Sequence, residues 1–138
     1  MAEGNPDPIR RLNPPALGAS PGYSQIVEVR ASRIIFIAGQ TSLNRDGELV
    51  GKSDFATQAE QVFQNLSAAL QSVGCNASNL VKLTVFLRDM GHLPIYREAR
   101  NRFFATVTPP AAPAVTLIEV SKLYSPNFLI EIEAVAAV

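Results

Sequence analysis

The stretch Phe128-Leu-Ile-Glu-Ile-Glu-Ala-Val-Ala-Ala-Val138 decides the fold class, because it places two acids among apolar residues at the alternate positions of a β-strand. Alternate side chains of a strand share a face, so Glu131 and Glu133 point one way and Ile132 points the other. Two interpretations of the acids remain open. They either lie on a solvated strand face, as is ordinary in antiparallel sheets, or face a cleft where a carboxylate does chemistry.

In the rest of the chain, the spacing of apolar residues predicts further strands and two helices. Apolar residues at three- and four-residue steps predict a helix over residues 54–73, with Ser53 or Asp54 as its N-cap and Gly74 just after its end. A second helix is expected over about residues 93–105, with Pro94 in its first turn. The remaining predicted strands are residues 25–30, 33–39, 80–87 and 114–120.

The order of these elements predicts an α+β domain of two layers, in which one mixed sheet carries both helices on one face. Residues 25–30 and 33–39 are expected to form a hairpin through Ala31-Ser32, and the second of these strands is apolar enough to be central. Five prolines fall among the first 21 residues, so residues 1–21 are expected to form an irregular arm. Residues 22–138 then form a single domain.

Length and composition restrict the class of protein. A chain of 138 residues suits one domain, and its single cysteine, Cys75, excludes an intrachain disulfide and favours a reducing compartment. We expect a cytoplasmic protein without membrane association, because no stretch approaches the roughly 20 apolar residues of a membrane span. Twelve basic and twelve acidic side chains cancel, which argues against non-specific nucleic-acid binding. Arg97, Arg100 and Arg102 are interpreted as a solvated helix face.

Several common kinds of site lack the residues they require. His92 is the only histidine and Cys75 the only thiol, so a Ser-His-Asp or Cys-His catalytic set and a zinc site are poorly supported. We expect His92 to cap a helix or lie on the surface, and Cys75 to pack as a small apolar residue. The glycines are scattered, without the spacing of a phosphate-binding loop.

Six short pieces are informative through their order and spacing. They are Pro21-Gly-Tyr-Ser-Gln25, Ile37-Ala-Gly-Gln40, Gly47-Glu-Leu-Val50, Leu83-Thr-Val-Phe-Leu-Arg-Asp-Met90, Phe103-Phe104 and Leu129-Ile-Glu-Ile-Glu-Ala-Val135. With these pieces, the chain from about Leu12 onward resembles the Rid family of reactive-intermediate deaminases, also called YjgF-like proteins. The resemblance implies a chorismate-mutase-like fold and a homotrimer with small-molecule clefts between subunits. It also implies hydrolysis of imines or enamines to an oxo compound and ammonia without a metal or organic cofactor.

The resemblance also suggests site residues. Glu131 matches the glutamate that positions water in the family, and Tyr23 matches a tyrosine that lines the cleft. The family arginine that holds the substrate carboxylate is absent, because Val115 stands at its position. The other residues expected to line the cleft are Ala38, Gly39, Arg97, Thr116 and Leu117.

Two of these positions depart from the family pattern, since Ala38 stands in place of a serine and Leu117 in place of a common cysteine. The tyrosine piece is also rearranged, because it reads Pro21-Gly22-Tyr23 where the family has Gly-Pro-Tyr. Arg97 either compensates for the missing arginine or is a solvated helix residue. Three functions therefore remain: a deaminase whose activity toward 2-aminoacrylate is weak or redirected, a trimer that binds a small metabolite without turnover, and, with least support, an RNA-cleaving or translation-inhibiting protein.

Overall fold

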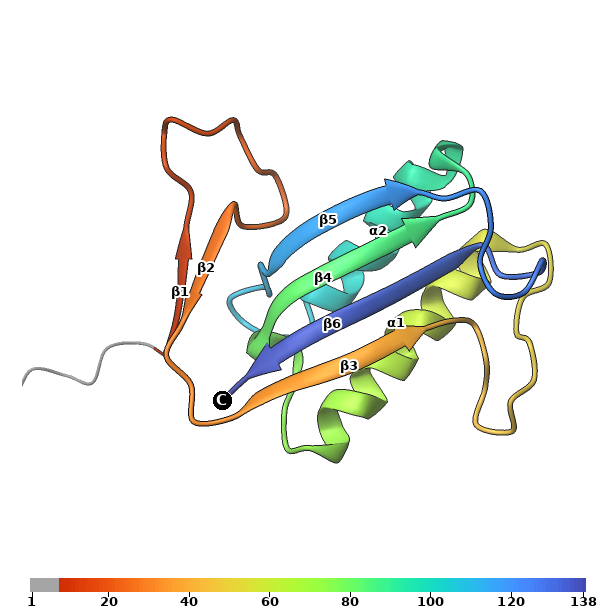
Figure 1. Ribbon diagram of the computed structural model, residues 1–138, viewed down its shortest axis with the longest axis horizontal. Coiled ribbons are helices and arrows are strands. Elements are labelled where there is room, and N and C mark those ends of the chain that lie inside the picture. Colours follow the sequence, from red (N-terminus) through yellow and green to blue (C-terminus); the bar gives the residue numbers. More distant parts are fainter. Residues whose placement is uncertain (1–7) are drawn as a thin grey trace, which may run out of the picture.

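This computed structural model describes residues 8–138 of the chain. They contain six β-strands and two α-helices (Figure 1). The strands are β1 (Ile9–Leu12), β2 (Ile26–Val29), β3 (Ile34–Gln40), β4 (Leu80–Leu87), β5 (Ala114–Glu119) and β6 (Ile130–Ala137). The helices are α1 (Phe55–Ser72) and α2 (Leu93–Phe104), and short 3-10 turns at Ala77–Asn79 and Met90–His92 precede β4 and α2.

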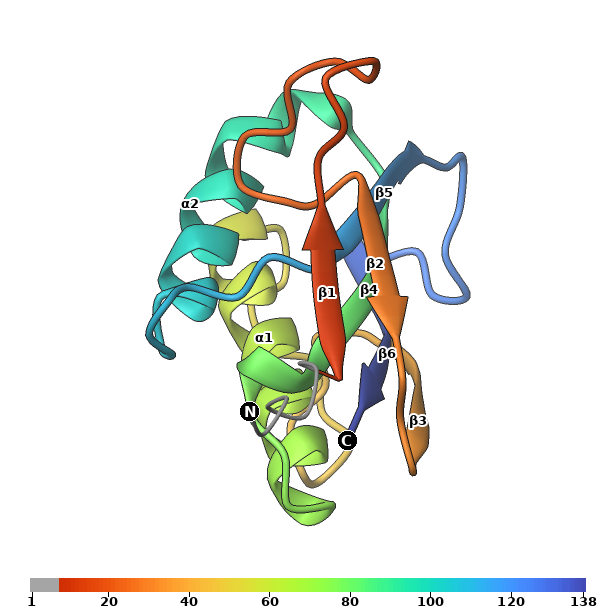
Figure 2. The same cartoon turned by 90° about the vertical axis from the view of Figure 1, so that its left-hand side faces the viewer.

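The main sheet has four strands in the order β3-β6-β4-β5. β6 runs antiparallel to both β3 and β4, whereas β4 and β5 are parallel and are connected through α2. Both helices cover the same face of this sheet, as the two perpendicular views show (Figures 1 and 2). The predicted two-layer α+β architecture is therefore confirmed. Within residues 8–138, neither helix is long and apolar enough to cross a bilayer.

Local sequence signals account for the limits of α1. Its N-cap is Asp54, whose carboxylate accepts hydrogen bonds from the backbone N–H of Thr57 at 3.2 Å and from the Thr57 hydroxyl at 2.7 Å. These bonds lower the pKa of Asp54, because they stabilise its charged form. Gly74 follows the helix with a φ of +76°, a conformation that glycine adopts without steric cost. The predicted helix and its end signals are confirmed.

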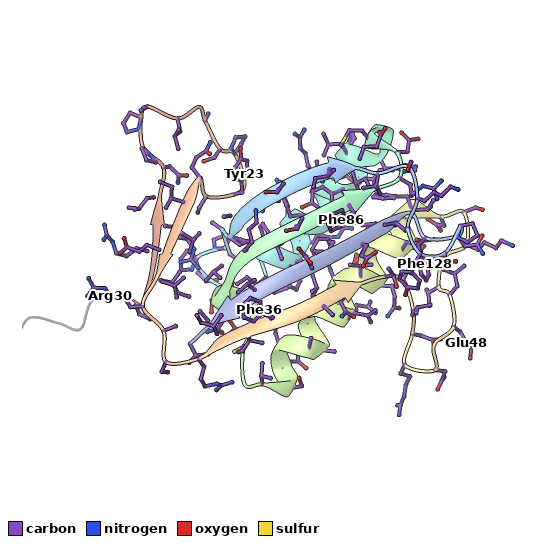
Figure 3. The ribbon with its side chains drawn as sticks, in the orientation of Figure 1. Tyr23, Arg30, Phe36, Glu48, Phe86 and Phe128 are labelled. Atoms are coloured by element: carbon purple, nitrogen blue, oxygen red, sulfur yellow. The ribbon has the colours of Figure 1, made fainter. Side chains whose placement is uncertain are left out.

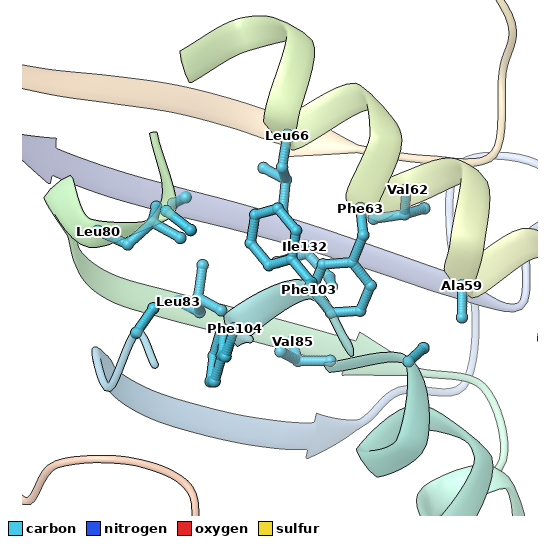
Figure 4. Close-up of a cluster of buried hydrophobic side chains, with 14 of the residues drawn as sticks. Ala59, Val62, Phe63, Leu66, Leu80, Leu83, Val85, Phe103, Phe104 and Ile132 are labelled. Atoms are coloured by element: carbon cyan, nitrogen blue, oxygen red, sulfur yellow. The ribbon is translucent and has the colours of Figure 1, made fainter. Parts of the chain in front are cut away.

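The core lies between the helices and the main sheet (Figure 4). Leu66 of α1, Leu83 of β4 and Ile132 of β6 are each 0% exposed. The rings of Phe63 and Phe103 join the two helices, with centroids 4.9 Å apart. Each such buried side chain contributes about 1.5–3 kcal/mol relative to an exposed one, so burial fixes which face of each strand points toward the helices.

The N-terminal part of the chain differs from the prediction in two ways. Residues 1–21 were expected to be irregular, but β1 lies within them and pairs with β2, with Ile9 opposite Val29. The expected hairpin of residues 25–30 with 33–39 is also wrong, because β3 pairs only with β6 and is an edge strand of the main sheet. The proline-free run of β1 offers apolar side chains that pack with β2 against the main sheet. This second cluster contains Ile9, Val27, Val29, Val81, Val135 and Ala137.

The segment before β2 is attached to the start of β5. Ser24 donates a backbone hydrogen bond to the carbonyl of Pro113 at 3.1 Å and a hydroxyl hydrogen bond to the carbonyl of Ala112 at 2.5 Å. Ser24 also forms a parallel bridge with Ala114. Tyr23 therefore lies beside the first residues of β5, where Figure 3 labels it.

Candidate ligand-binding site

Glu131 lies on the face of the main sheet opposite the helices. Its neighbours Ile130 and Ile132 are 0% exposed on the helix side, so the alternation of β6 directs Glu131 and Glu133 to the other side. Across the sheet, Glu131 is opposite Phe86 of β4, which is labelled in Figure 3. The predicted face of the two acids is confirmed.

The surroundings of Glu131 favour a reactive carboxyl group. Partial burial, the larger cause, and the negative charge of Glu133 both raise the pKa of Glu131. The side chain of Glu131 forms no hydrogen bond or ion pair with another residue in the range 8–138. Both oxygens remain available to a ligand or a water molecule, and a carboxylate with a raised pKa is a stronger base than an ordinary one.

Gly39 gives Glu131 the room it needs. A Cβ atom at position 39 would overlap the Glu131 carboxylate, so only glycine allows the two strands to place them in contact. The pairing of β3 with β6 is irregular between Ile37 and Gln40, which are the residues that flank this point. Ala38, Gly39 and Glu131 therefore form one group at the same place in the fold.

A cavity of about 430 Å³ begins at Gly39 and continues over the loop after β3. Tyr124 forms one side of it, and its hydroxyl is 2.9 Å from the hydroxyl of Thr41. Asn65 of α1 supports the loop by donating hydrogen bonds to the carbonyls of Thr41 and Leu43, at 3.1 and 2.9 Å. The sequence reasoning missed Tyr124 and Asn65. An aromatic residue in a polar loop between two strands was the available signal for Tyr124.

The β5 residues face in two directions. Val115 and Leu117 pack against the core on the helix side, whereas Thr116 is exposed on the other side. The ammonium group of Lys82 donates a hydrogen bond to the Thr116 hydroxyl. Within one chain, Val115 and Leu117 do not share a cleft with Ala38.

The expected site is consequently divided into two groups. Along β4, Glu131 is opposite Phe86 and Val115 is beside Leu83, a separation of three residues or about 10 Å. Glu131 and Val115 also lie on opposite faces of the sheet. Tyr23 belongs to the Val115 group, since Ser24 bridges to Ala114. A single chain does not bring the two groups together.

The arginines of α2 do not form the uniformly solvated face that was expected. Arg97 is exposed, and Arg102 forms an exposed ion pair with Glu60 at 3.2 Å. Arg100, however, is only 8% exposed and packs between aromatic rings. The interpretation of Arg100 as a surface residue is therefore wrong, because the segment before β2 covers this part of the helix.

Cys75 and His92 both pack against apolar or aromatic side chains. Cys75 is buried among apolar side chains, as predicted. His92 makes no side-chain capping bond but stacks on Phe55, with ring centroids 4.3 Å apart. Among residues 8–138, no three side chains of His, Cys, Asp or Glu are grouped so that they could hold a metal ion.

Comparison with known proteins identifies the family. A family model described as Endoribonuclease L-PSP matches residues 14–138. A RutC family protein of Pyrococcus horikoshii is 36% identical over 115 residues, which are 83% of this chain and 85% of the relative. Protein DfrA of Myxococcus xanthus is 37% identical over 123 residues, which are 89% of this chain and 88% of the relative.

Solved structures agree with these matches. The Rid family protein YyfB of Yersinia pestis superposes with a TM-score of 0.87 at 32% identity, covering 96% of this chain and 100% of that one. The YjgF gene product of E. coli superposes with a TM-score of 0.69 at 31% identity, covering 86% of this chain and 90% of the other. In both sequence and fold, the chain belongs to the Rid family, which includes the YjgF and RutC proteins.

Proposed function

We propose that the protein hydrolyses an imine or enamine to an oxo compound and ammonia, with Glu131 positioning the attacking water. The observation that supports this most is the unpaired Glu131 carboxylate against Gly39, with its raised pKa. In this mechanism, Glu131 accepts a proton as the water oxygen attacks the imine carbon. The proton then passes from Glu131 to the nitrogen, which gives a carbinolamine. Transfer of the carbinolamine hydroxyl proton to the amino nitrogen, again by way of Glu131, lets the C–N bond break, so that the C=O bond forms and ammonia leaves. An enamine first becomes an imine by protonation at carbon.

We further propose that the working form is a homotrimer with ligand clefts between subunits. The division of the expected site supports this, because a second chain can supply the Tyr23 and Val115 group next to Glu131. The helix-free face of the sheet also has unusual apolar exposure, with Ile34 60% and Phe36 81% exposed in the single chain.

The assembly can be measured directly. We expect light scattering to give a mass three times the 14.9 kDa of one chain. A Phe36→Glu variant should shift the mass toward that of one chain, because burying the new charge between subunits is unfavourable. A wild-type protein that remains a monomer or dimer would contradict both the trimer and the intersubunit cleft.

We expect the activity toward 2-aminoacrylate to be weak. Val115 cannot form the two-pronged contact that an arginine makes with a carboxylate. The loss of such a contact lowers kcat/KM by at least about tenfold. The enamine is generated with a serine dehydratase, and its decay is followed with this protein and with a relative that has the arginine. Equal rates for the two proteins would show that Val115 is no handicap.

A binding protein without turnover is the second candidate. The observation in its favour is that Val115 and Leu117 pack into the core of their own chain, and β5 has no basic side chain that could hold a substrate carboxylate. RNA cleavage, which the description of the matching family model suggests, has less support, because the chain has zero net charge and a single histidine.

A further inference from the structure

Arg100 is a buried cation without an acidic partner. Its side chain belongs to α2 and is 8% exposed. Within residues 8–138 it forms no ion pair, and its Nε and Nη2 atoms donate to the side-chain oxygen of Asn101 at 3.2 and 3.1 Å. An unpaired buried charge is costly, and proteins normally provide such a charge with a carboxylate or use it to bind an anion.

Hydrogen-bonding capacity remains free around this guanidinium. Nη1 of Arg100 makes no hydrogen bond within the described residues. The guanidinium carbon lies 5.8 Å from the ring centroid of Tyr96 and 5.9 Å from that of Phe104. The buried Tyr96 hydroxyl interacts with this guanidinium and has no other partner in this part of the chain. The Arg100 side chain therefore keeps donor capacity at Nη1 and has no acidic acceptor.

The altered tyrosine piece of the sequence has its explanation here. Gly22 has a φ of +81°, and a Cβ atom at this position would overlap Nη2 and lie 3.0 Å from the guanidinium carbon of Arg100. The order Pro21-Gly22-Tyr23 thus makes space for a guanidinium directly beneath the loop that carries Tyr23. A neighbouring cavity of about 340 Å³ is lined in part by Gly22, Tyr23, Asn101 and Phe104. Three of these four residues contact Arg100.

Arg100 lies at the same end of the fold as Val115. Gly22 is two residues before Ser24, Ser24 bridges to Ala114, and Val115 is the next residue of β5. Val115 also faces the helix layer, to which Arg100 belongs. Arg100 of α2 therefore lies at the end of the proposed cleft where β5 has no basic side chain. Arg97 is the less suitable residue, because it is exposed rather than fixed in one position.

We propose that Arg100 binds the carboxylate of the ligand from α2, in place of the arginine that β5 lacks. This inference rests on the proposed function and narrows the ligand to a 2-imino or 2-oxo acid. The carboxylate accepts hydrogen bonds from the Nη1 side of the guanidinium, below the Gly22–Tyr23 loop. Because the carboxylate is held from a different element, the preferred acid differs in shape from 2-aminoacrylate, which accounts for the weak activity expected with that compound.

The test compares binding of 2-oxobutyrate with that of 2-butanone, which has a methyl group in place of the carboxylate. Wild type, Arg100→Leu and the matched control Arg102→Leu, which removes an exposed arginine of the same helix, are titrated by NMR after the mass of each assembly has been checked. We expect Arg100→Leu to raise the Kd of 2-oxobutyrate by at least about tenfold, because a charge-assisted contact is lost. Arg102→Leu should leave this Kd nearly unchanged, and neither substitution should affect binding of 2-butanone.

Other measurements keep the inference open to refutation if Arg100→Leu does not fold. Arg100→Lys retains the positive charge but lacks the planar pair of N–H donors of a guanidinium, so it should weaken binding to an intermediate degree. In a crystal of the wild-type protein soaked with 2-oxobutyrate, the carboxylate should contact Nη1. A carboxylate bound elsewhere, equal affinity of wild type for acid and ketone, or an unchanged Kd in a folded Arg100→Leu protein would each overturn the proposal.

The same data separate this inference from the proposed reaction. Binding of 2-oxobutyrate requires no hydrolysis, so binding that depends on Arg100 without any imine turnover would refute the reaction alone. Conversely, Glu131-dependent turnover with an unchanged KM in Arg100→Leu would refute only the role of Arg100. A lower Tm with unchanged binding would assign Arg100 to holding the Gly22–Tyr23 loop.

Discussion

Replacing Glu131 with glutamine is expected to lower kcat/KM for imine hydrolysis by at least about 100-fold, the usual contribution of a positioned general base. The amide keeps the size of the side chain beside Gly39 but accepts a proton far less readily. The matched control is Glu133→Gln, which removes an acid from the same strand face two residues away. Initial rates with an imine generated in situ should show a large loss only in Glu131→Gln.

The pH dependence supplies a second readout for the same residue. Glu131 acts as the carboxylate, so activity should fall as the pH decreases through its pKa, which lies above the ordinary value of about 4.3. Because the charge of Glu133 contributes to this shift, Glu133→Gln should move the acidic limb of the profile to lower pH. A limb that stays in place in Glu133→Gln would mean that another group controls the rate.

Stability should change in the opposite sense from activity. A carboxyl group whose pKa is raised by folding binds protons more tightly in the folded state, so its ionisation destabilises the protein as the pH rises through that pKa. Glu131→Gln should therefore be slightly more stable than wild type at neutral pH. A loss of activity accompanied by a lower Tm would instead indicate a damaged fold.

Replacing Gln58 with methionine is expected to lower the free energy of unfolding by about 2–3 kcal/mol, because three backbone groups lose their partner. Gln58 is 0% exposed. Its amide donates to the carbonyls of Gly51 and Asn127 at 3.0 and 2.9 Å, and its oxygen accepts from the N–H of Leu129 at 2.9 Å. Methionine fills a similar volume but replaces none of these bonds.

Urea unfolding monitored by circular dichroism measures this effect, with Gln64→Met as the control. Gln64 lies on the exposed side of the same helix, so its replacement should change stability by less than about 0.5 kcal/mol. A similar small change in Gln58→Met would show that water replaces the lost bonds. Since Leu129 is two residues before Glu131, the destabilised variant should also show a reduced kcat.

Elements with a strong local signal were predictable from the sequence. The apolar spacing of α1, the Asp54 cap and Gly74 depend on residues within a few positions of one another, and the structure confirms them. The face of Glu131 was also determined locally, because a strand has a period of two and Ile130 and Ile132 require burial. The family resemblance rested on such short pieces, which is why it could be recognised before the fold was known.

Tertiary structure decided the features that depend on which segments meet. β2 pairs with β1 rather than with β3, because the apolar residues of both strands gain burial against Val81 and Ala137, which are distant in sequence. Arg97 and Arg100 look equivalent in the sequence, yet only Arg100 is covered, because Ser24 attaches its segment to β5 and brings Gly22 over the helix. Periodicity determines which side of an element is apolar, whereas the partner that covers it is selected by non-local packing.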